Sequence, residues 1–278
     1  MSDAKPSSPS KRSPLKVVLI VVASIVALVL LAVGGLVAYA NLRPVNAADY
    51  RVAQGDLEGL TLALEPLVNR QSQMLDLSTD PTPEQIEAAG QAQRDQLKAF
   101  SDAVDAYGDV RAMKDPEMER LHQRLVTTRD EELAPMVNDF VDNYAAVSTM
   151  VKACETFDAS LPTQPPGDAD RAWFDAQVAA CEEAVTAAAA STIFAPLVKV
   201  RQDQIAAMRV GYEEYGAAVG KGDLEAETAA QEKIGKAQVG IGTRMARGLE
   251  GVSSIAHHTF VAVDIDIAEI DTYCTDKV

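Results

Sequence analysis

Residues 95–108 read DQLKAFSDAVDAYG, and their apolar side chains are spaced as on one face of a helix. Leu97, Phe100, Val104 and Tyr107 follow one another at steps of three, four and three residues. Such steps place side chains on one face of an α-helix, whereas a strand would show alternation. The stretch therefore predicts an amphipathic helix that buries this face against a neighbour.

The same pattern returns 108 residues later, where residues 203–216 read DQIAAMRVGYEEYG. Aligned at this offset, residues 95–123 and 203–231 share nine identical positions, against roughly two or three expected by chance. The identical pairs are Asp95 and Asp203, Gln96 and Gln204, Ala99 and Ala207, Tyr107 and Tyr215, Gly108 and Gly216, Asp115 and Asp223, Glu117 and Glu225, Glu119 and Glu227, and Gln123 and Gln231. Similarity at a fixed offset is typical of an internal repeat.

The repeat predicts an all-α domain of two homologous units, residues 47–160 and 168–278. A looser match at another offset, Pro66-Leu67-Val68 against Pro196-Leu197-Val198, favours the same division. One helical hairpin cannot bury its apolar face alone, so we expect the units to pack together as an antiparallel bundle of about four to six helices. Residues 161–167 include three prolines and a glycine and are the predicted linker.

Capping residues mark where the predicted helices begin. We predict N-caps at Thr82, Asp115, Asp168 and Asp223, because their side chains can accept hydrogen bonds from the free N–H groups of a first turn. Thr82 is followed by proline and, three positions on, by glutamine, which is the pattern of a capping box.

Three prolines, Pro66, Pro135 and Pro196, lie inside stretches that otherwise read as helix. We expect each to kink or break its helix. Residues 261–267 alternate like a strand, yet their apolar residues and those that follow also fit helical spacing, and we expect a helix there. Five glycines between Gly235 and Gly251 fall in one predicted helix, where they would allow close packing.

Residues 17–40 read VVLIVVASIVALVLLAVGGLVAYA and carry no charge. As a helix they would rise about 36 Å, enough for a hydrocarbon layer of about 30 Å. The segment predicts a single transmembrane helix in contact with membrane lipid. The alternative is a signal peptide cleaved after Ala40, since Ala38-Tyr39-Ala40 fits a small-x-small cleavage site. The apolar run is longer than such a peptide needs, so we prefer the anchor.

Charge is distributed unevenly about this segment. Residues 1–16 hold Lys5, Lys11, Arg12 and Lys16 against Asp3, while the whole chain has a net charge of −16. A basic, Ser- and Pro-rich tail before an apolar span predicts a disordered cytoplasmic tail and a domain outside the cytoplasm at the cell membrane. The acidic body argues against a nucleic-acid partner, since phosphate binding needs clustered Lys and Arg.

The three cysteines, Cys154, Cys181 and Cys274, all follow the apolar span, where disulfides can form. Cys154 and Cys181 are the predicted pair, because that bond would join the end of the first unit to the first helix of the second. The alternative is that all three are small buried residues.

Candidate chemical sites are few. Glu119 and His122 match one Glu-x-x-His motif, but Ala230 replaces the histidine in the second unit, whereas a di-iron bundle uses two motifs. We therefore expect Glu119 and His122 to be polar residues at the surface. His257 and His258 lack a haem-attachment motif. The carboxylates Asp264, Asp266, Glu269 and Asp271 lack the spacing of a calcium loop and should form the solvated side of a helix. The sequence thus predicts no catalytic residue, metal or cofactor, and no enzyme.

The function that these features favour is a membrane-anchored extracytoplasmic interaction protein, an accessory or scaffold subunit of a membrane complex in a bacterial envelope. The chain is Ala-rich and Lys-poor, which favours a bacterial source. The alternative is an extracytoplasmic helical bundle that binds a small molecule or lipid. A metal or haem carrier rests on the histidines alone.

Overall fold

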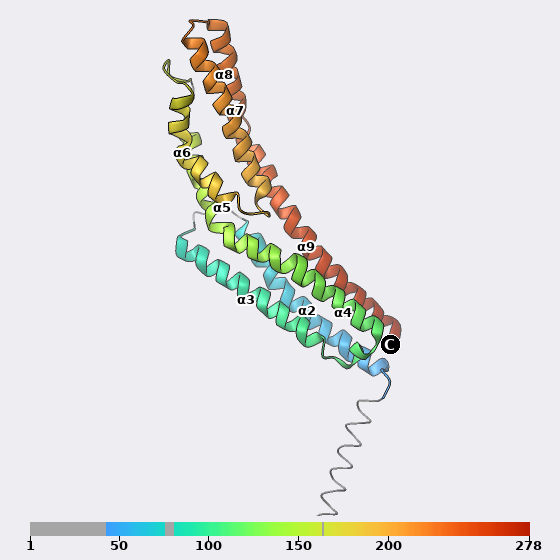
Figure 1. Ribbon diagram of the computed structural model, residues 1–278. Helices are drawn as coiled ribbons and strands as arrows, with labels where there is room; N and C mark the ends of the chain where they lie inside the picture. The colour runs from blue at the N-terminus through green and yellow to red at the C-terminus, as the bar shows by residue number, and fades with distance from the viewer. Residues whose placement is uncertain (1–42, 76–80, 163) are drawn as a thin grey trace, which may run out of the picture. The chain divides into compact units, whose positions relative to one another are not determined.

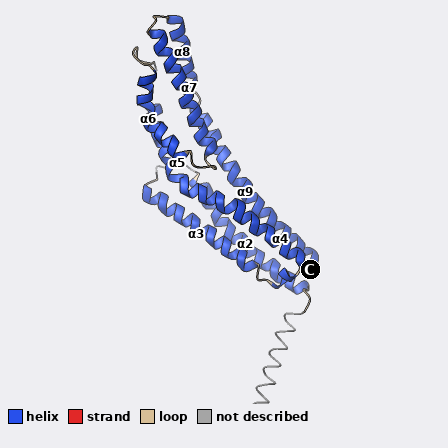
Figure 2. Cartoon of the chain, in the orientation of Figure 1, coloured by secondary structure: helices blue, strands red, loops and turns tan. Residues whose placement is uncertain are grey.

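The computed structural model describes residues 43–75, 81–162 and 164–278, and all secondary structure in those ranges is helical (Figure 2). The predicted all-α class is confirmed for this part of the chain. Residues 46–278 form one compact unit. The predicted tail and transmembrane segment, 1–16 and 17–40, lie outside the described residues. Among the described helices, none has the length and apolar character needed to cross a membrane.

The described residues form eight α-helices, which are labelled in Figure 1. They are α2 (Ala47–Met74), α3 (Pro83–Tyr107), α4 (Pro116–Thr128), α5 (Ala134–Ser160), α6 (Arg171–Ala188), α7 (Ala195–Val219), α8 (Leu224–Gln238) and α9 (Ile241–Lys277). A short 3₁₀ turn, η1 (Arg111–Lys114), precedes α4, and a π-helical turn, η2 (Arg129–Leu133), joins α4 to α5.

Most of the predicted helix starts are confirmed. Thr82 caps α3 in a capping box with Gln85, and Asp115 and Asp223 cap α4 and α8 by accepting hydrogen bonds from backbone N–H groups at 2.9 and 3.1 Å. The prediction for Asp168 was wrong. Asp170 caps α6 instead, through a 2.8 Å hydrogen bond from the Trp173 N–H. Both aspartates suit an N-cap chemically, so residue type alone did not separate them.

The three prolines behave differently from one another. Pro66 lies inside α2, which continues through it, so of the predicted kink or break the break does not occur. Pro135 is the second residue of α5, close after η2, and a π turn near the proline lets the helix continue although one N–H is missing. Pro196 stands in the first turn of α7, where its missing N–H costs nothing.

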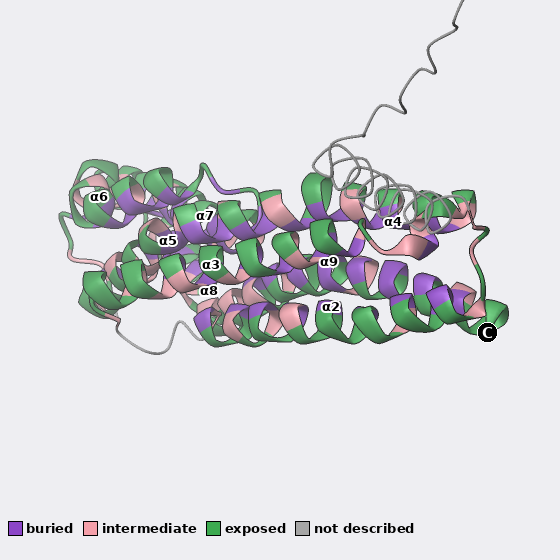
Figure 3. Cartoon of the chain, turned by 90° about the horizontal axis from the view of Figure 1, so that it is seen from below, coloured by how far each residue is buried: buried purple, intermediate pink, exposed green. Residues whose placement is uncertain are grey.

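Helices α5 and α9 each pack against helices from distant parts of the chain. Helix α9 packs on α2 and α4 as well as on α7, and α5 packs on both α3 and α6. These two helices therefore connect a first group of helices, α2, α3 and α4, with a second group, α6, α7 and α8. Figure 3 shows buried and exposed residues sharing each helix, as amphipathic sequences require. The predicted helix across 261–267 is confirmed as part of α9.

Glycines near the start of α9 have two separate roles. Gly240 has a φ of 74° and sits between α8 and α9, so the prediction of a single helix across this region was wrong. A left-handed φ is open to glycine without steric cost, and it ends α8. A Cβ on Gly248 would lie 3.1 Å from the Leu197 Cα, and one on Gly251 would lie 3.0 Å from the Pro196 Cβ. Close packing of α9 on α7 is thus confirmed for these two glycines.

Candidate functional site

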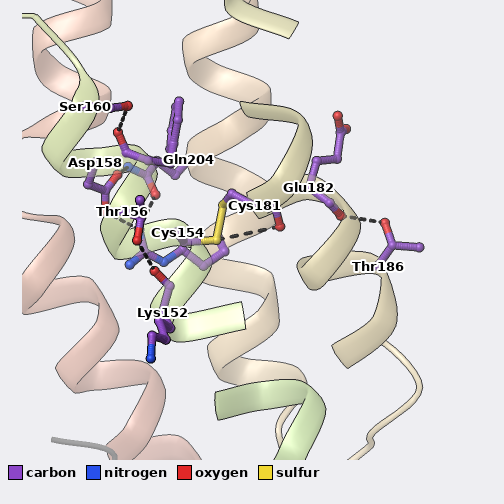
Figure 4. Close-up of a disulfide and its surroundings, with 11 residues drawn as sticks. Lys152, Cys154, Thr156, Asp158, Ser160, Cys181, Glu182, Thr186 and Gln204 are labelled. Atoms are coloured by element: carbon purple, nitrogen blue, oxygen red, sulfur yellow. Dashed lines mark hydrogen bonds and ion pairs between the residues drawn. A yellow bond between two sulfur atoms is a disulfide. The ribbon is translucent and has the colours of Figure 1, made fainter. Parts of the chain in front are cut away.

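A disulfide joins α5 to α6, as the sequence predicted. Cys154 and Cys181 are bonded, with Cα atoms 4.6 Å apart and a sequence separation of 27 residues. Both side chains are buried, and Figure 4 shows the bond between the two helices. The linker at 161–167 lies within the loop that this bond closes, so the disulfide limits how far α5 and α6 can separate.

A buried polar cluster lies beside the disulfide (Figure 4, where Asp158 and Gln204 are labelled). The guanidinium of Arg201 on α7 is only 3% exposed, and its Nη1 donates to Asp158 Oδ2 on α5 at 2.5 Å. The same Nη1 donates to Gln204 Oε1 at 2.9 Å, and Gln204 Nε2 donates to Asp158 Oδ1 at 2.9 Å. A charge this deeply buried needs such partners, because an isolated one would cost several kcal/mol. The sequence did not indicate this cluster, since Asp158 is 43 residues from Arg201.

A second polar cluster lies where α2 begins and α9 ends. Asp115 Oδ2 accepts hydrogen bonds from the Tyr50 hydroxyl and, at 2.8 Å, from the Tyr273 hydroxyl. Burial alone would raise the pKa of Asp115, but bonds from Tyr50, the Glu117 N–H and Tyr273 outweigh it and lower the pKa. Burial, followed by the bond to Asp115, raises the pKa of Tyr50 and of Tyr273. The phenols therefore stay protonated and act as donors, which is a structural role.

The third cysteine, Cys274, is free and buried in α9. Burial raises the pKa of its thiol to about 11, only partly offset by Tyr107. Because the thiolate is the reactive form, this cysteine is unsuited to nucleophilic chemistry.

The predicted chemical candidates do not converge. Glu119 is exposed on α4, whereas His122 is buried with its Nε2 2.9 Å from the Val104 carbonyl oxygen, so the expectation that both lie at the surface was wrong for His122. His257 and His258 are both exposed on α9, where neither faces the core. Within the described ranges, no group of three or more His, Cys, Asp or Glu side chains is placed to hold a metal ion.

The carboxylates near the end of α9 bind other helices. Asp266 is buried, so its predicted place on the solvated side was wrong; it pairs with Arg124 at 2.6 Å and accepts from the Thr128 hydroxyl at 2.6 Å. Glu269 pairs with the same arginine, and Asp271 accepts from Gln54 on α2 at 2.9 Å. These contacts hold α9 against α4 and α2.

One face of α2 is not covered by any other part of the chain that the structure describes. The side of α2 away from the core carries Ala48, Val52, Gly55, Gly59 and Leu62, which we call the α2 stripe. Val52 and Leu62 are 61% and 60% exposed, and nothing lies within 4 Å of a Cβ placed on either glycine. A row of small and apolar side chains in the open is suited to contact with another helix.

The comparisons with known proteins return nothing: no family model, curated protein or solved structure matches this chain. The class of the protein therefore rests on its fold, an all-α bundle whose helices are tied by a disulfide.

Proposed function

We propose that this protein is a membrane-anchored extracytoplasmic interaction protein, without enzymatic activity, that serves as an accessory or scaffold subunit of a bacterial envelope complex. Its first partner is a second copy of the same chain, bound through the α2 stripe. The observation that carries the proposal is the pattern of residues on and beside that stripe.

The α2 stripe has the spacing of a coiled-coil seam. Val52, Gly55, Gly59 and Leu62 follow at steps of three, four and three residues, which are successive a and d positions of a heptad. Their opposite face, with Ala53, Leu57, Leu60 and Leu64, is the buried side of α2. One face of α2 thus packs in the core of the bundle. The second face is exposed among the described residues and could contact another helix.

Charges flank the seam in a complementary arrangement. With Val52 at an a position, Arg51 and Glu65 occupy g positions, and Asp56 and Arg70 occupy e positions. In a parallel pair, each g residue meets the e residue five positions further along the other helix. Arg51 would then meet Asp56 of the second copy, and Glu65 would meet Arg70 of the second copy.

Nothing in the described part of the chain pairs with these charges. Arg51, Asp56, Glu65 and Arg70 form no ion pair or hydrogen bond there, and the Arg70 Nε is buried without an acceptor. A tether at residues 17–40 would start α2 from the same membrane face in both copies, which favours the parallel orientation. Shared attachment to one membrane also raises the effective concentration of the two helices.

Cross-linking of the full-length chain in membranes tests the pairing. Val52→Cys places a thiol on the seam, where the two copies approach, and should give a disulfide-linked dimer on mild oxidation. Val210→Cys is the matched control, because Val210 is similarly exposed, at 52%, but lies on α7. Equal cross-linking of both variants would show that the stripe is not the interface.

A charge exchange tests the register independently. Arg51→Glu should weaken the dimer, because it faces Asp56 of the second copy with a like charge. The double variant Arg51→Glu with Asp56→Arg restores opposite charges and should recover dimerisation, measured by light scattering of the detergent-solubilised chain. A double variant no better than the single one would contradict the parallel register.

The anchor and topology belong to the same proposal and have their own test. Their support is the uncharged segment 17–40 with the basic tail before it. Mass spectrometry of the purified protein should find residues 1–40 still attached. A mature chain that starts at Asn41 would replace the anchor by a cleaved signal peptide.

A larger complex should be recovered by affinity purification from gently solubilised membranes. Recovery of the homodimer alone would remove the accessory-subunit part of the proposal and leave the pairing intact. A bundle that binds a small molecule is the second candidate function, and a pocket at Arg201 favours it.

A further inference from the structure

Among the described residues, the guanidinium of Arg201 leaves part of its donors without an acceptor. Both of its hydrogen bonds to described residues use Nη1, while Nε is buried and donates to no acceptor. The remaining Nε–Nη2 edge is a fork of two parallel N–H groups, the geometry that binds a carboxylate in bidentate fashion. A buried donor without an acceptor lowers stability, so a ligand oxygen that reached this edge would be stabilised there.

Arg201 lines a cavity of about 390 Å³ where α5, α7 and α9 meet. This volume lies within the range of small-molecule sites. Val151, Leu197 and Met245 contribute apolar walls. The cavity therefore combines a non-polar lining with one fixed polar anchor, the composition typical of a ligand site.

The charges around the cavity restrict the ligand further. Asp158, already paired with Arg201, and Glu155, which is exposed, also line it. Two carboxylates against one guanidinium would repel a simple anion. A ligand that brings an ammonium group together with its carboxylate would satisfy both signs.

We propose that this cavity binds a free α-amino acid with an apolar side chain. Its carboxylate binds the Nε–Nη2 edge of Arg201, its ammonium faces Glu155 and Asp158, and its side chain packs on Val151, Leu197 and Met245. The site is separate from the α2 stripe, so the proposal stands or falls independently of dimerisation.

Calorimetric titration of the detergent-solubilised full chain tests the ligand class with three probes. L-Leucine carries both charges, 4-methylpentanoate lacks the ammonium, and 3-methylbutylamine lacks the carboxylate. We expect L-leucine to bind and each of the other two to bind at least about tenfold more weakly. No binding of L-leucine at about 10 mM, or equal binding of 4-methylpentanoate, overturns the proposal.

Two variants assign the contacts. Glu155→Gln should weaken L-leucine about tenfold and leave 4-methylpentanoate unchanged, because only the former has an ammonium group. Glu183→Gln, an exposed glutamate on α6 away from the cavity, is the matched control and should change neither. Loss of L-leucine binding in both variants, or in neither, contradicts the role of Glu155.

Arg201→Lys keeps a cation beside Asp158 but removes the two-pronged edge. We expect it to fold, as checked by circular dichroism, and to lose L-leucine binding by at least about tenfold. A folded Arg201→Lys protein with unchanged affinity would show that the carboxylate does not bind at Arg201.

Discussion

At the scale of single residues, Asp115 shows what a sequence can and cannot predict. Its role as the N-cap of α4 follows from its place before a proline and is confirmed. Its bonds to Tyr50 and Tyr273 could not be predicted, because those partners lie 65 and 158 residues away. The buried Arg201 was missed for the same reason. Local chemistry is visible in a sequence, whereas contacts between distant segments depend on the packing of whole helices.

Asp115 should make the fold sensitive to acid. Because the pKa of Asp115 is lowered by folding, its stabilisation is complete above the unfolded value of about 3.9 and is lost as pH falls through the folded value. Asp115→Asn should therefore cost about 1–3 kcal/mol in urea unfolding at pH 7 and less at about pH 3.

The control for this measurement is Asp109→Asn, an exposed aspartate just before η1. It should change the free energy of unfolding little at either pH. If the Asp115→Asn difference is the same at both pH values, the ionised carboxylate does not stabilise the fold.

At the scale of elements, the repeat accounts for part of the helix order. Helices α3, α4 and α5 are followed in the second half by α7, α8 and α9, and the capping residues Asp115 and Asp223 stand at equivalent places. The looser match between residues 66–68 and 196–198 does not correspond to equivalent helix positions. Pro66 lies inside α2, whereas Pro196 lies in the first turn of α7. Duplication remains a prediction for the three matching helices. Proline effects were hard to predict, because the cost of a lost hydrogen bond depends on position in the helix.

Two glycines in neighbouring helices should respond oppositely to alanine. Gly248→Ala places a Cβ 3.1 Å from the Leu197 Cα, so α9 and α7 must separate slightly, and we expect a loss of about 1–3 kcal/mol. Gly235→Ala in α8 meets nothing within 4 Å and should gain about 0.5–1 kcal/mol from helix propensity. Urea unfolding of both variants measures the difference. Shifts of the same sign would show that Gly248 is not a packing contact.

At the scale of the whole molecule, the disulfide is a covalent link between α5 and α6. Closing a loop of this length limits the unfolded chain and should stabilise the fold by about 3–4 kcal/mol in the chain-entropy account. We expect a reductant to lower the urea midpoint of the native protein. The Cys154→Ser/Cys181→Ser variant should start at the lower midpoint and be insensitive to the reductant. A reductant effect that persists in this variant would show that the stabilisation comes from elsewhere.

The position of α9 governs when the protein can fold during its synthesis. Gln54 on α2 donates to Asp271 and Thr275, partners that are 217 and 221 residues later in the chain. The core beside α2 and α4 therefore stays incomplete until the ribosome has made residues 271–275. Contacts this distant in sequence carry a high loop-closure cost and slow the search for the native state. Until α9 has been made, the apolar faces of α2 and α4 stay exposed. We therefore expect this chain to depend on a chaperone more than a bundle whose core is closed by helices adjacent in sequence.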